Sequence, residues 1–182
     1  MSAVLRLSPQ TYLEQERLSE TKHEFCNGEV FAMSGASYAH NVITANIIRE
    51  LGNQLKQRPC RVLPSDMRVR VEDGFVYPDV SVVCGKPEFY DKDNLCNPSV
   101  IVEVLSPSTA DYDANGKFAR YRQLASLQEY LLVAQDRPHL LHYVRQAENR
   151  WLLSEYRGAV EFELPNIGCR LDLTEVYANV LE

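Results

Sequence analysis

The sequence has no apolar stretch long enough to cross a membrane and no internal repeat. A membrane-spanning helix needs about 20 consecutive apolar residues, and no such run occurs among the 182 residues. The segment Met1 to Arg17 also has no continuous apolar run followed by a small-residue cleavage site, as a secretory signal would have. We therefore expect a protein without a membrane partner, outside the usual secretory route, and folded as a single domain over residues 1–182.

Closely spaced cysteine pairs are missing as well. The sequence contains five cysteines, an odd number, and no Cys-x-x-Cys motif. Disulfide frameworks and zinc knuckles both depend on paired, regularly spaced cysteines. We therefore expect neither, and a reducing cytoplasm is the simplest location.

Three common catalytic motifs are absent. The sequence has no Gly-x-Ser-x-Gly, no Walker A loop and no Gly-x-Gly-x-x-Gly. Serine hydrolases, nucleotide hydrolases and dinucleotide-binding enzymes depend on these motifs to place their reactive groups. Nothing in the sequence supports those three classes.

Excess positive charge is a further missing feature. The formal net charge is −6, from 19 Lys and Arg against 25 Asp and Glu. Proteins that coat nucleic acid use Lys and Arg to displace counterions from phosphate, so this charge argues against nonspecific coating. An acidic cluster that holds a metal is compatible with it, because a local basic patch can still meet phosphate. Binding of nucleic acid should then depend on the metal.

The order of periodic patterns predicts an α/β (α+β) fold, with a mixed sheet flanked by helices. Turn signals at Asn27-Gly28 and Asp73-Gly74 predict two hairpins, over 22–33 and 67–84. Helical spacing and capping signals predict helices from Ser8-Pro9, over 41–56 and over 114–127. Further strands are expected at 100–105, 130–134, 139–145 and 150–156, with the first of these central and linked to the second by a helical crossover.

Two carboxylates interrupt strands that are otherwise apolar. Glu103 lies in Val-Ile-Val-Glu-Val-Leu, and Asp79 lies in Tyr-Pro-Asp-Val-Ser-Val-Val. Because a strand has period two, Glu103 shares a face with Ile101 and Leu105, where an unpaired carboxylate would be costly. Either acid alone is as readily explained by an arginine or by backbone hydrogen bonds. Both together favour a hard divalent cation such as Mg²⁺, and we expect their strands to be neighbours.

Three other polar residues bear on this site. Lys117 precedes Tyr121 and Leu124 at spacings of four and seven, which predicts a side chain that faces the sheet and can reach the acids. The alternative is a lysine that extends its amine to solvent. Glu24, in the first hairpin, could add a ligand, although charged hairpin residues are usually solvated. His40, at a helix start, could contact substrate, but histidines at helix starts are commonly just exposed, and we expect His40 to lie outside the site.

Four motifs in this order resemble those of a known family. They are Glu24-Phe25-Cys26-Asn27-Gly28-Glu29, Pro78-Asp79-Val80, Val102-Glu103-Val104-Leu105-Ser106-Pro107-Ser108-Thr109 and Lys117. From about residue 8 to residue 180 the chain resembles the Uma-type restriction endonuclease family of the PD-(D/E)xK superfamily. The resemblance implies a restriction-endonuclease-like fold and magnesium-dependent cleavage of nucleic-acid phosphodiesters. It also implies that Asp79 is the motif aspartate, Glu103 the (D/E) residue and Glu24 a possible additional acid.

The chain departs from the superfamily pattern at one position. Leu105 stands two residues after Glu103, where the pattern has lysine, and Lys117 is the substitute that the family pattern suggests. One alternative is therefore an inactive nuclease fold, used for nucleic-acid binding or dimerisation, in which Glu103 and Lys117 form a salt bridge. A second alternative is a hydrolase of a small phosphoester, which would use the same acids without a basic surface.

The residues and the resemblance together predict a metal-dependent endonuclease. Asp79 and Glu103 are expected to hold Mg²⁺ or Mn²⁺, and Lys117 to position a water or to stabilise transition-state charge. DNA is the expected partner, and a symmetric homodimer is expected because two sites cut a duplex more easily than one. Arginines that could contact the phosphate backbone, although such side chains are more often only solvated, are Arg68, Arg70, Arg120 and Arg122.

Overall fold

The structure is a computed structural model that describes residues 6–106 and 112–180. It is a mixed α+β fold in which most strands belong to two six-stranded sheets. The N-terminal sheet has the order β2 (Glu29–Ala32), β1 (His23–Cys26), β5 (Gly74–Val76), β4 (Arg68–Val71), β8 (Asn94–Leu95), β7 (Phe89–Tyr90). The central sheet has the order β12 (Arg150–Arg157), β11 (His139–Ala147), β10 (Glu129–Ala134), β9 (Val100–Leu105), β6 (Val80–Cys84), β3 (Cys60–Pro64).

Four α-helices, a π-helical turn and a small sheet complete the described elements. The helices are α1 (Pro9–Glu16), α2 (Tyr38–Leu55), α3 (Phe118–Tyr121) and α4 (Leu173–Val176), with the π-helical turn η1 (Tyr112–Lys117) directly before α3. Strands β13 (Glu161–Leu164) and β14 (Cys169–Asp172) pair only with each other. Within the described ranges, no helix combines the length and apolar character needed to cross a bilayer.

Local sequence signals explain the first elements. Ser8 caps α1 by accepting a hydrogen bond from the Thr11 backbone N–H, and Pro9 occupies the first turn. In the β1–β2 hairpin, Asn27 and Gly28 have φ angles of 51° and 85°, which these residue types tolerate best. The predictions of a short first helix and a first hairpin are confirmed.

Strand β9 lies inside the central sheet, as its near-continuous apolar sequence predicts. It pairs with β10 in parallel and with β6 in antiparallel orientation, where Val80 lies opposite Val102. The strands that carry Asp79 and Glu103 are therefore neighbours, as expected. The parallel β9–β10 pair, joined through η1 and α3, also confirms the predicted crossover.

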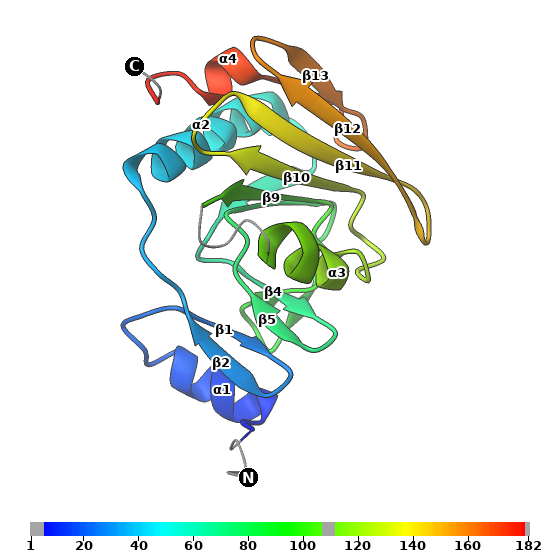
Figure 1. The fold of residues 1–182 in the computed structure, drawn as a ribbon. Coiled ribbons are helices and arrows are strands. Elements are labelled where there is room, and N and C mark those ends of the chain that lie inside the picture. Colours follow the sequence, from blue (N-terminus) through cyan, green and yellow to red (C-terminus); the bar gives the residue numbers. More distant parts are fainter. Residues whose placement is uncertain (1–5, 107–111, 181–182) are drawn as a thin grey trace.

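Two apolar layers cover the two faces of the central sheet. On one face, Ile43 and Ile47 of α2 pack with the β9 residues Val100 and Val102. On the other face, Tyr121 of α3 packs with Ile101, together with apolar residues of the N-terminal sheet. Figure 1 shows α2 and α3 on opposite sides of the central sheet, with the N-terminal sheet beyond α3. The space between the two large sheets is where the polar site described below is formed.

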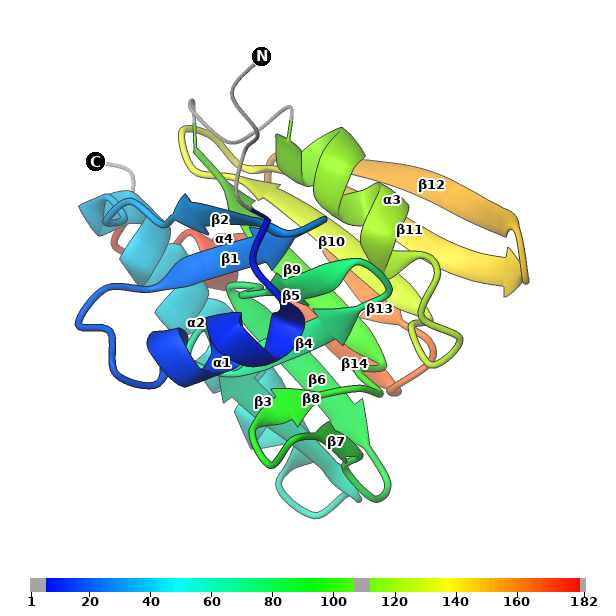
Figure 2. The same cartoon turned by 90° about the horizontal axis from the view of Figure 1, so that it is seen from below.

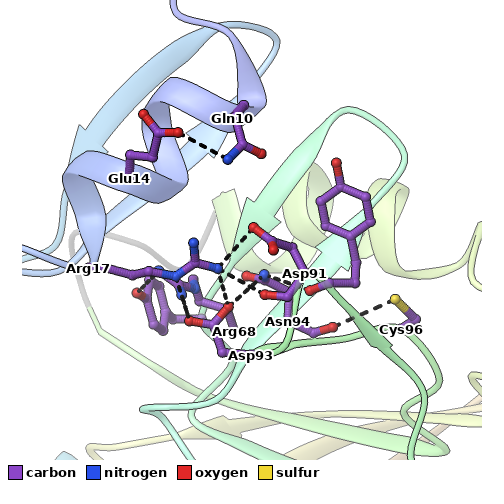
Figure 3. A network of polar contacts seen from close by, with 10 residues as sticks. Gln10, Glu14, Arg17, Arg68, Asp91, Asp93, Asn94 and Cys96 are labelled. Carbon is purple, nitrogen blue, oxygen red and sulfur yellow. Dashed lines mark hydrogen bonds and ion pairs between the residues drawn. The ribbon is translucent and has the colours of Figure 1, made fainter.

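Helix α1 is fixed to the N-terminal sheet by rings and by ion pairs. The Tyr12 ring stacks on Phe25 and Phe75, with centroid distances of 4.9 and 5.6 Å. Figure 2 shows α1 lying across this sheet. At the end of the helix, Arg17 donates to both carboxylate oxygens of Asp93 (Figure 3). The hairpin that carries Glu24 is thereby held against a rigid support.

Two expected elements are wrong in extent. Residues 75–84 do not form one strand, because the chain leaves the N-terminal sheet after β5 and enters the central sheet at β6. Pro78 lies at this crossing and has no backbone N–H to donate to a ladder. The predicted helix over 114–127 is shorter, since η1 and α3 end at Tyr121 and turns follow. The small β13–β14 sheet was not predicted.

The expectation of no disulfide is also wrong. Cys60 and Cys84 lie opposite each other in the β3–β6 pair and are joined by a disulfide. Their separation of 24 residues is not a recognised motif spacing, so only the strand register brings them together. Because disulfides are uncommon in reducing compartments, the cysteine content no longer supports a cytoplasmic location.

Candidate active site

Strand pairing brings the two predicted carboxylates together. Asp79 directly precedes β6, one residue before the Val80–Val102 pair, and Glu103 lies one residue beyond that pair on β9. The Asp79 backbone N–H lies 3.4 Å from Glu103 Oε2, and the Val104 backbone N–H donates to Asp79 Oδ2 at 2.7 Å. The two acids therefore meet at the junction of adjacent strands.

Glu103 is buried and has specific partners. The residue is only 2% exposed. The Tyr121 hydroxyl donates to Glu103 Oε1 at 2.9 Å, and Lys117 Nζ lies 3.4 Å from the same oxygen. Burial raises the pKa of the Tyr121 phenol well above its ordinary value, and the charges of Glu103 and Glu24 raise it further. Tyr121 therefore stays protonated and remains a donor to this carboxylate.

Lys117 joins Glu103 to the N-terminal sheet. It is 7% exposed, and its amine lies 3.0 Å from Glu24 Oε1 on β1. The π-helical turn η1 ends at Lys117, and the following spacing of four directs both Lys117 and Tyr121 to Glu103. The prediction that Lys117 faces the sheet is confirmed.

Glu24 differs from the solvated hairpin residue that is usual at such a position. It is 5% exposed, and it accepts a hydrogen bond from the Tyr77 backbone N–H at 3.2 Å in addition to the ion pair with Lys117. Tyr77 belongs to the segment that crosses between the sheets just before Asp79. Glu24 therefore ties that crossing segment to the lysine.

His40 contradicts the expectation of an exposed residue outside the site. Its Nε2 lies 3.0 Å from Asp79 Oδ1, and both side chains are about 15% exposed. The reason is the start of α2: Ser37 is the N-cap and accepts from the His40 backbone N–H, so the helix begins earlier than predicted. His40 then lies in the first turn and faces Asp79. The sequence analysis considered His40 but placed it outside the site, and it did not consider Tyr121 as a site residue.

All of these side chains except Tyr121 line one cleft. The cleft has a volume of about 920 Å³ and lies between the N-terminal and central sheets. Its polar centre consists of Glu24, His40, Asp79, Glu103 and Lys117. A cleft with convergent charged groups is the usual form of a small-ligand or catalytic site.

The four arginines considered as phosphate contacts have different environments. Arg68 is buried, donates to Asp93 at 2.6 Å and is not available to a ligand. Arg120 lines the cleft and forms an ion pair with Asp73 at 3.0 Å. Arg70 and Arg122 are outside the cleft lining. Arg120 is thus the arginine placed to meet a ligand in this cleft.

The donor set for a metal is small. Across residues 6–106 and 112–180, no three His, Cys, Asp or Glu side chains are arranged to hold a metal ion by themselves. The neighbouring carboxylates of Asp79 and Glu103 supply hard oxygen donors, which suit Mg²⁺. Mg²⁺ in proteins is commonly bound through one or two carboxylates and keeps several waters, for which the cleft has room. The residues present therefore fit such an ion.

Comparisons with known proteins identify the family of the chain and a shared fold. The family model Uma2, described as "Putative restriction endonuclease", matches residues 9–174. Two uncharacterized proteins of Synechocystis sp. are similar: sll1609 is 38% identical over 168 residues (88% of this chain, 95% of that protein), and slr1290 is 33% identical over 174 residues (94% and 92%). A crystal structure from Anabaena variabilis, described as "a putative nuclease belonging to DUF820", matches with a TM-score of 0.72 at 16% identity, over 88% of this chain and 92% of that chain. This last match shows a shared fold.

Proposed function

The chain belongs to the Uma2 family, and we propose that it hydrolyses nucleic-acid phosphodiester bonds with a divalent metal ion. The observation that carries this proposal is the meeting of Asp79 and Glu103, from adjoining strands, with the Lys117 amine in one cleft. Hydrolysis adds water across one P–O ester bond and yields a phosphate monoester and a hydroxyl group. This chemistry needs a positioned water and stabilisation of charge on phosphate.

Each site residue has a role in this proposal. Asp79 and Glu103 would hold Mg²⁺, or Mn²⁺ in its place. A bound ion of this kind lowers the pKa of water and polarises a phosphoryl oxygen. Lys117 would donate a hydrogen bond to the attacking water or to a phosphate oxygen, since its amine already lies among the carboxylates. Glu24 would orient that amine.

Two residues would act by positioning the carboxylates. Tyr121 donates to Glu103 Oε1 and restricts its rotation. His40 contacts Asp79 Oδ1, while the Val104 backbone N–H holds the other oxygen. Partners that orient ligating carboxylates affect metal affinity by about 10- to 100-fold. The lysine of the superfamily pattern is replaced by Leu105, and Lys117 would supply the cation from the following helical segment.

An inactive nuclease fold is favoured by one observation. Lys117 is already in ion-pair distance of two buried carboxylates, which a purely structural cluster would also show. Such a module would bind nucleic acid or dimerise without cutting.

A symmetric homodimer is the arrangement that would let an active enzyme cut both strands of DNA. Sedimentation over a range of concentrations tests for this dimer.

The test is a cleavage assay on DNA, RNA and a chromogenic small phosphodiester, with Mg²⁺, Mn²⁺ or a chelator. We expect the protein to cut a nucleic acid only with metal, and Asp79→Asn or Glu103→Gln to abolish cleavage. Glu155→Gln is the matched control, because Glu155 is a solvent-exposed, ion-paired carboxylate on β12 outside the cleft lining. Metal-dependent cleavage of only the small substrate would favour the phosphoesterase alternative. Absence of any cleavage, with wild-type affinity for nucleic acid in Glu103→Gln, would support the inactive module.

A further inference from the structure

An exposed aromatic ring stands beside the acidic centre of the cleft. Phe31 on β2 is 49% exposed and lines the cleft. In the β1–β2 hairpin it lies directly opposite Glu24, so both side chains project from the same face of the hairpin. The ring is therefore a close neighbour of the carboxylate that pairs with Lys117.

In the part of the chain that the structure describes, the surroundings of Phe31 differ from those of the phenylalanines in the aromatic clusters. Phe25, Phe75 and Phe118 each stack on or tilt against another aromatic ring. No described ring contacts Phe31. A single exposed apolar residue is common on protein surfaces, but this one is placed within the proposed reaction site. Its open face is available to a planar group of the substrate.

The size of the cleft limits what can reach the carboxylates. A volume of about 920 Å³ lies within the range of about 300 to 1,000 Å³ typical of small-ligand pockets. Glu103 is only 2% exposed, so a phosphate must enter the cleft to approach it. A flexible unpaired strand can do so more easily than a stiff duplex.

The connection between β2 and α2 also lines the cleft. The segment from Met33 to Ser37, which connects β2 to α2, contributes lining residues, and Figure 1 shows it running between the N-terminal sheet and α2.

The charges in the cleft favour the same substrate. Lys22 and Arg120 both line it, and each is paired with a carboxylate, at 2.5 Å from Asp66 and 3.0 Å from Asp73. Duplex binding relies on many phosphate contacts by Lys and Arg. Binding of single strands relies in addition on bases that stack on aromatic rings. A cleft with few available cations and one exposed ring matches the second mode.

We propose that the substrate is a single strand of nucleic acid, and that the base next to the cleaved phosphate stacks on Phe31. This inference rests on the proposed function and specifies its substrate class. The cleft of one copy is sufficient for such a substrate. DNA and RNA share the stacking chemistry, so both are compared in the test.

The experiment measures fluorescence anisotropy of a short labelled strand, as DNA and as RNA, and of the corresponding duplexes. Ca²⁺ replaces Mg²⁺ as an oxygen-binding cation, so that binding is observed without cleavage. The variants are Phe31→Ala, which removes the ring, and Phe31→Trp, which keeps an aromatic face. Phe89→Ala is the control, because Phe89 is 47% exposed on β7 and outside the cleft lining. Thermal melts check that all variants are folded.

We expect the wild type to bind the single strand more tightly than the duplex. Phe31→Ala should weaken single-strand binding roughly 5- to 150-fold, the range for loss of one base–aromatic stack. Phe31→Trp and Phe89→Ala should retain wild-type affinity. A strand that lacks one base at the stacking position should bind the wild type more weakly than the intact strand. Removing that base should not lower the affinity of Phe31→Ala any further.

Two results would overturn this inference without affecting the proposed function. They are equal or tighter binding of the duplex, and unchanged single-strand affinity in Phe31→Ala. If duplex were preferred and then cut with Mg²⁺ in a Glu103-dependent reaction, the proposed function would stand without the single-strand substrate. If the wild type neither bound nor cut any of the nucleic acids, both proposals would fail.

Discussion

Replacing Glu103 by glutamine separates a metal-binding role from a structural one. The amide can still accept the Tyr121 hydrogen bond, but the charge is lost. Lys117 loses a partner at 3.4 Å and keeps the closer one, Glu24 at 3.0 Å, so its ammonium is not left unpaired. Repulsion between Glu103 and Asp79 is removed at the same time. Without metal, we therefore expect the free energy of unfolding to stay within about 1 kcal/mol of wild type, against the roughly 3–5 kcal/mol typical of a stranded buried charge.

Addition of Mg²⁺ should then distinguish the wild type from Glu103→Gln. A ligand at 100 times its Kd stabilises the folded state by about 2.7 kcal/mol. For a protein of this length, each kcal/mol raises Tm by roughly 2–4 °C, so the wild type should gain about 5–11 °C. Glu103→Gln should gain nothing, because one of the two carboxylates that would hold the ion has lost its charge.

Thermal melts with and without Mg²⁺, combined with calorimetric Mg²⁺ titration, measure both quantities. Glu155→Gln is the control and should show the full wild-type gain, since its carboxylate is outside the cleft. The reasoning is refuted if the wild type binds no divalent ion and metal-free Glu103→Gln is destabilised by about 3–5 kcal/mol. That pair of results would assign the cluster a structural role and end the nuclease proposal.

Three further predictions concern other groups. Tyr121→Phe should cost about 1.5–3 kcal/mol in denaturant unfolding, because it removes a buried hydrogen bond to a carboxylate; an unchanged midpoint would show that this bond is not formed. Hydrogen bonds from Arg17 lower the pKa of Asp93, so Asp93 contributes stability above its unfolded pKa that is lost as pH falls through the folded one. Below about pH 4, the stability of Asp93→Asn in thermal melts should fall less steeply with pH than that of the wild type. Parallel pH dependences would contradict the lowered pKa of Asp93. Reduction of Cys60–Cys84 should lower the free energy of unfolding by up to about 3.5 kcal/mol, given its loop of 24 residues, and a double Cys→Ser variant should melt identically with and without reductant.

Local patterns were sufficient for much of the central sheet. The apolar run of β9 predicts a strand covered on both faces, and β9 is buried between β10 and β6. The carboxylates that interrupt β9 and precede β6 predict a shared environment, which the Asp79–Glu103 contact provides. Periodicity reports which face of an element is buried, and two polar exceptions in apolar strands need each other or a common partner.

The division into two large sheets was not available from the same patterns. Periodicity defines a strand but not the strand it pairs with, and β5 and β6 follow each other closely in sequence. Pro78 marked an irregularity between them, without showing that the chain changes sheets there. Gly74 carried a similar hidden constraint: a Cβ at this position would lie 1.7 Å from the Phe25 carbonyl oxygen in the β1–β5 pair. Such contacts depend on tertiary packing.

His40 shows why a contact between residues far apart in the sequence could not be predicted from the local pattern. It lies 39 residues before Asp79, and a histidine near a helix start has the same local sequence whether it is exposed or faces a carboxylate. The usable signal was Ser37, whose position as N-cap places His40 in the first turn of α2. Only the packing of α2 on the central sheet then brings His40 to the carboxylate.

The charge of the buried cluster explains why the acidic net charge is compatible with a phosphate substrate. Glu24, Asp79 and Glu103 are three carboxylates, and Lys117 is one ammonium, which gives the cluster a formal charge of −2. Without a cation this cluster would repel phosphate, whatever the shape of the cleft. One divalent ion would balance the formal charge of the cluster, and phosphate could then approach the site without repulsion. The metal dependence of catalysis and that of nucleic-acid binding therefore have a single electrostatic origin in this proposal.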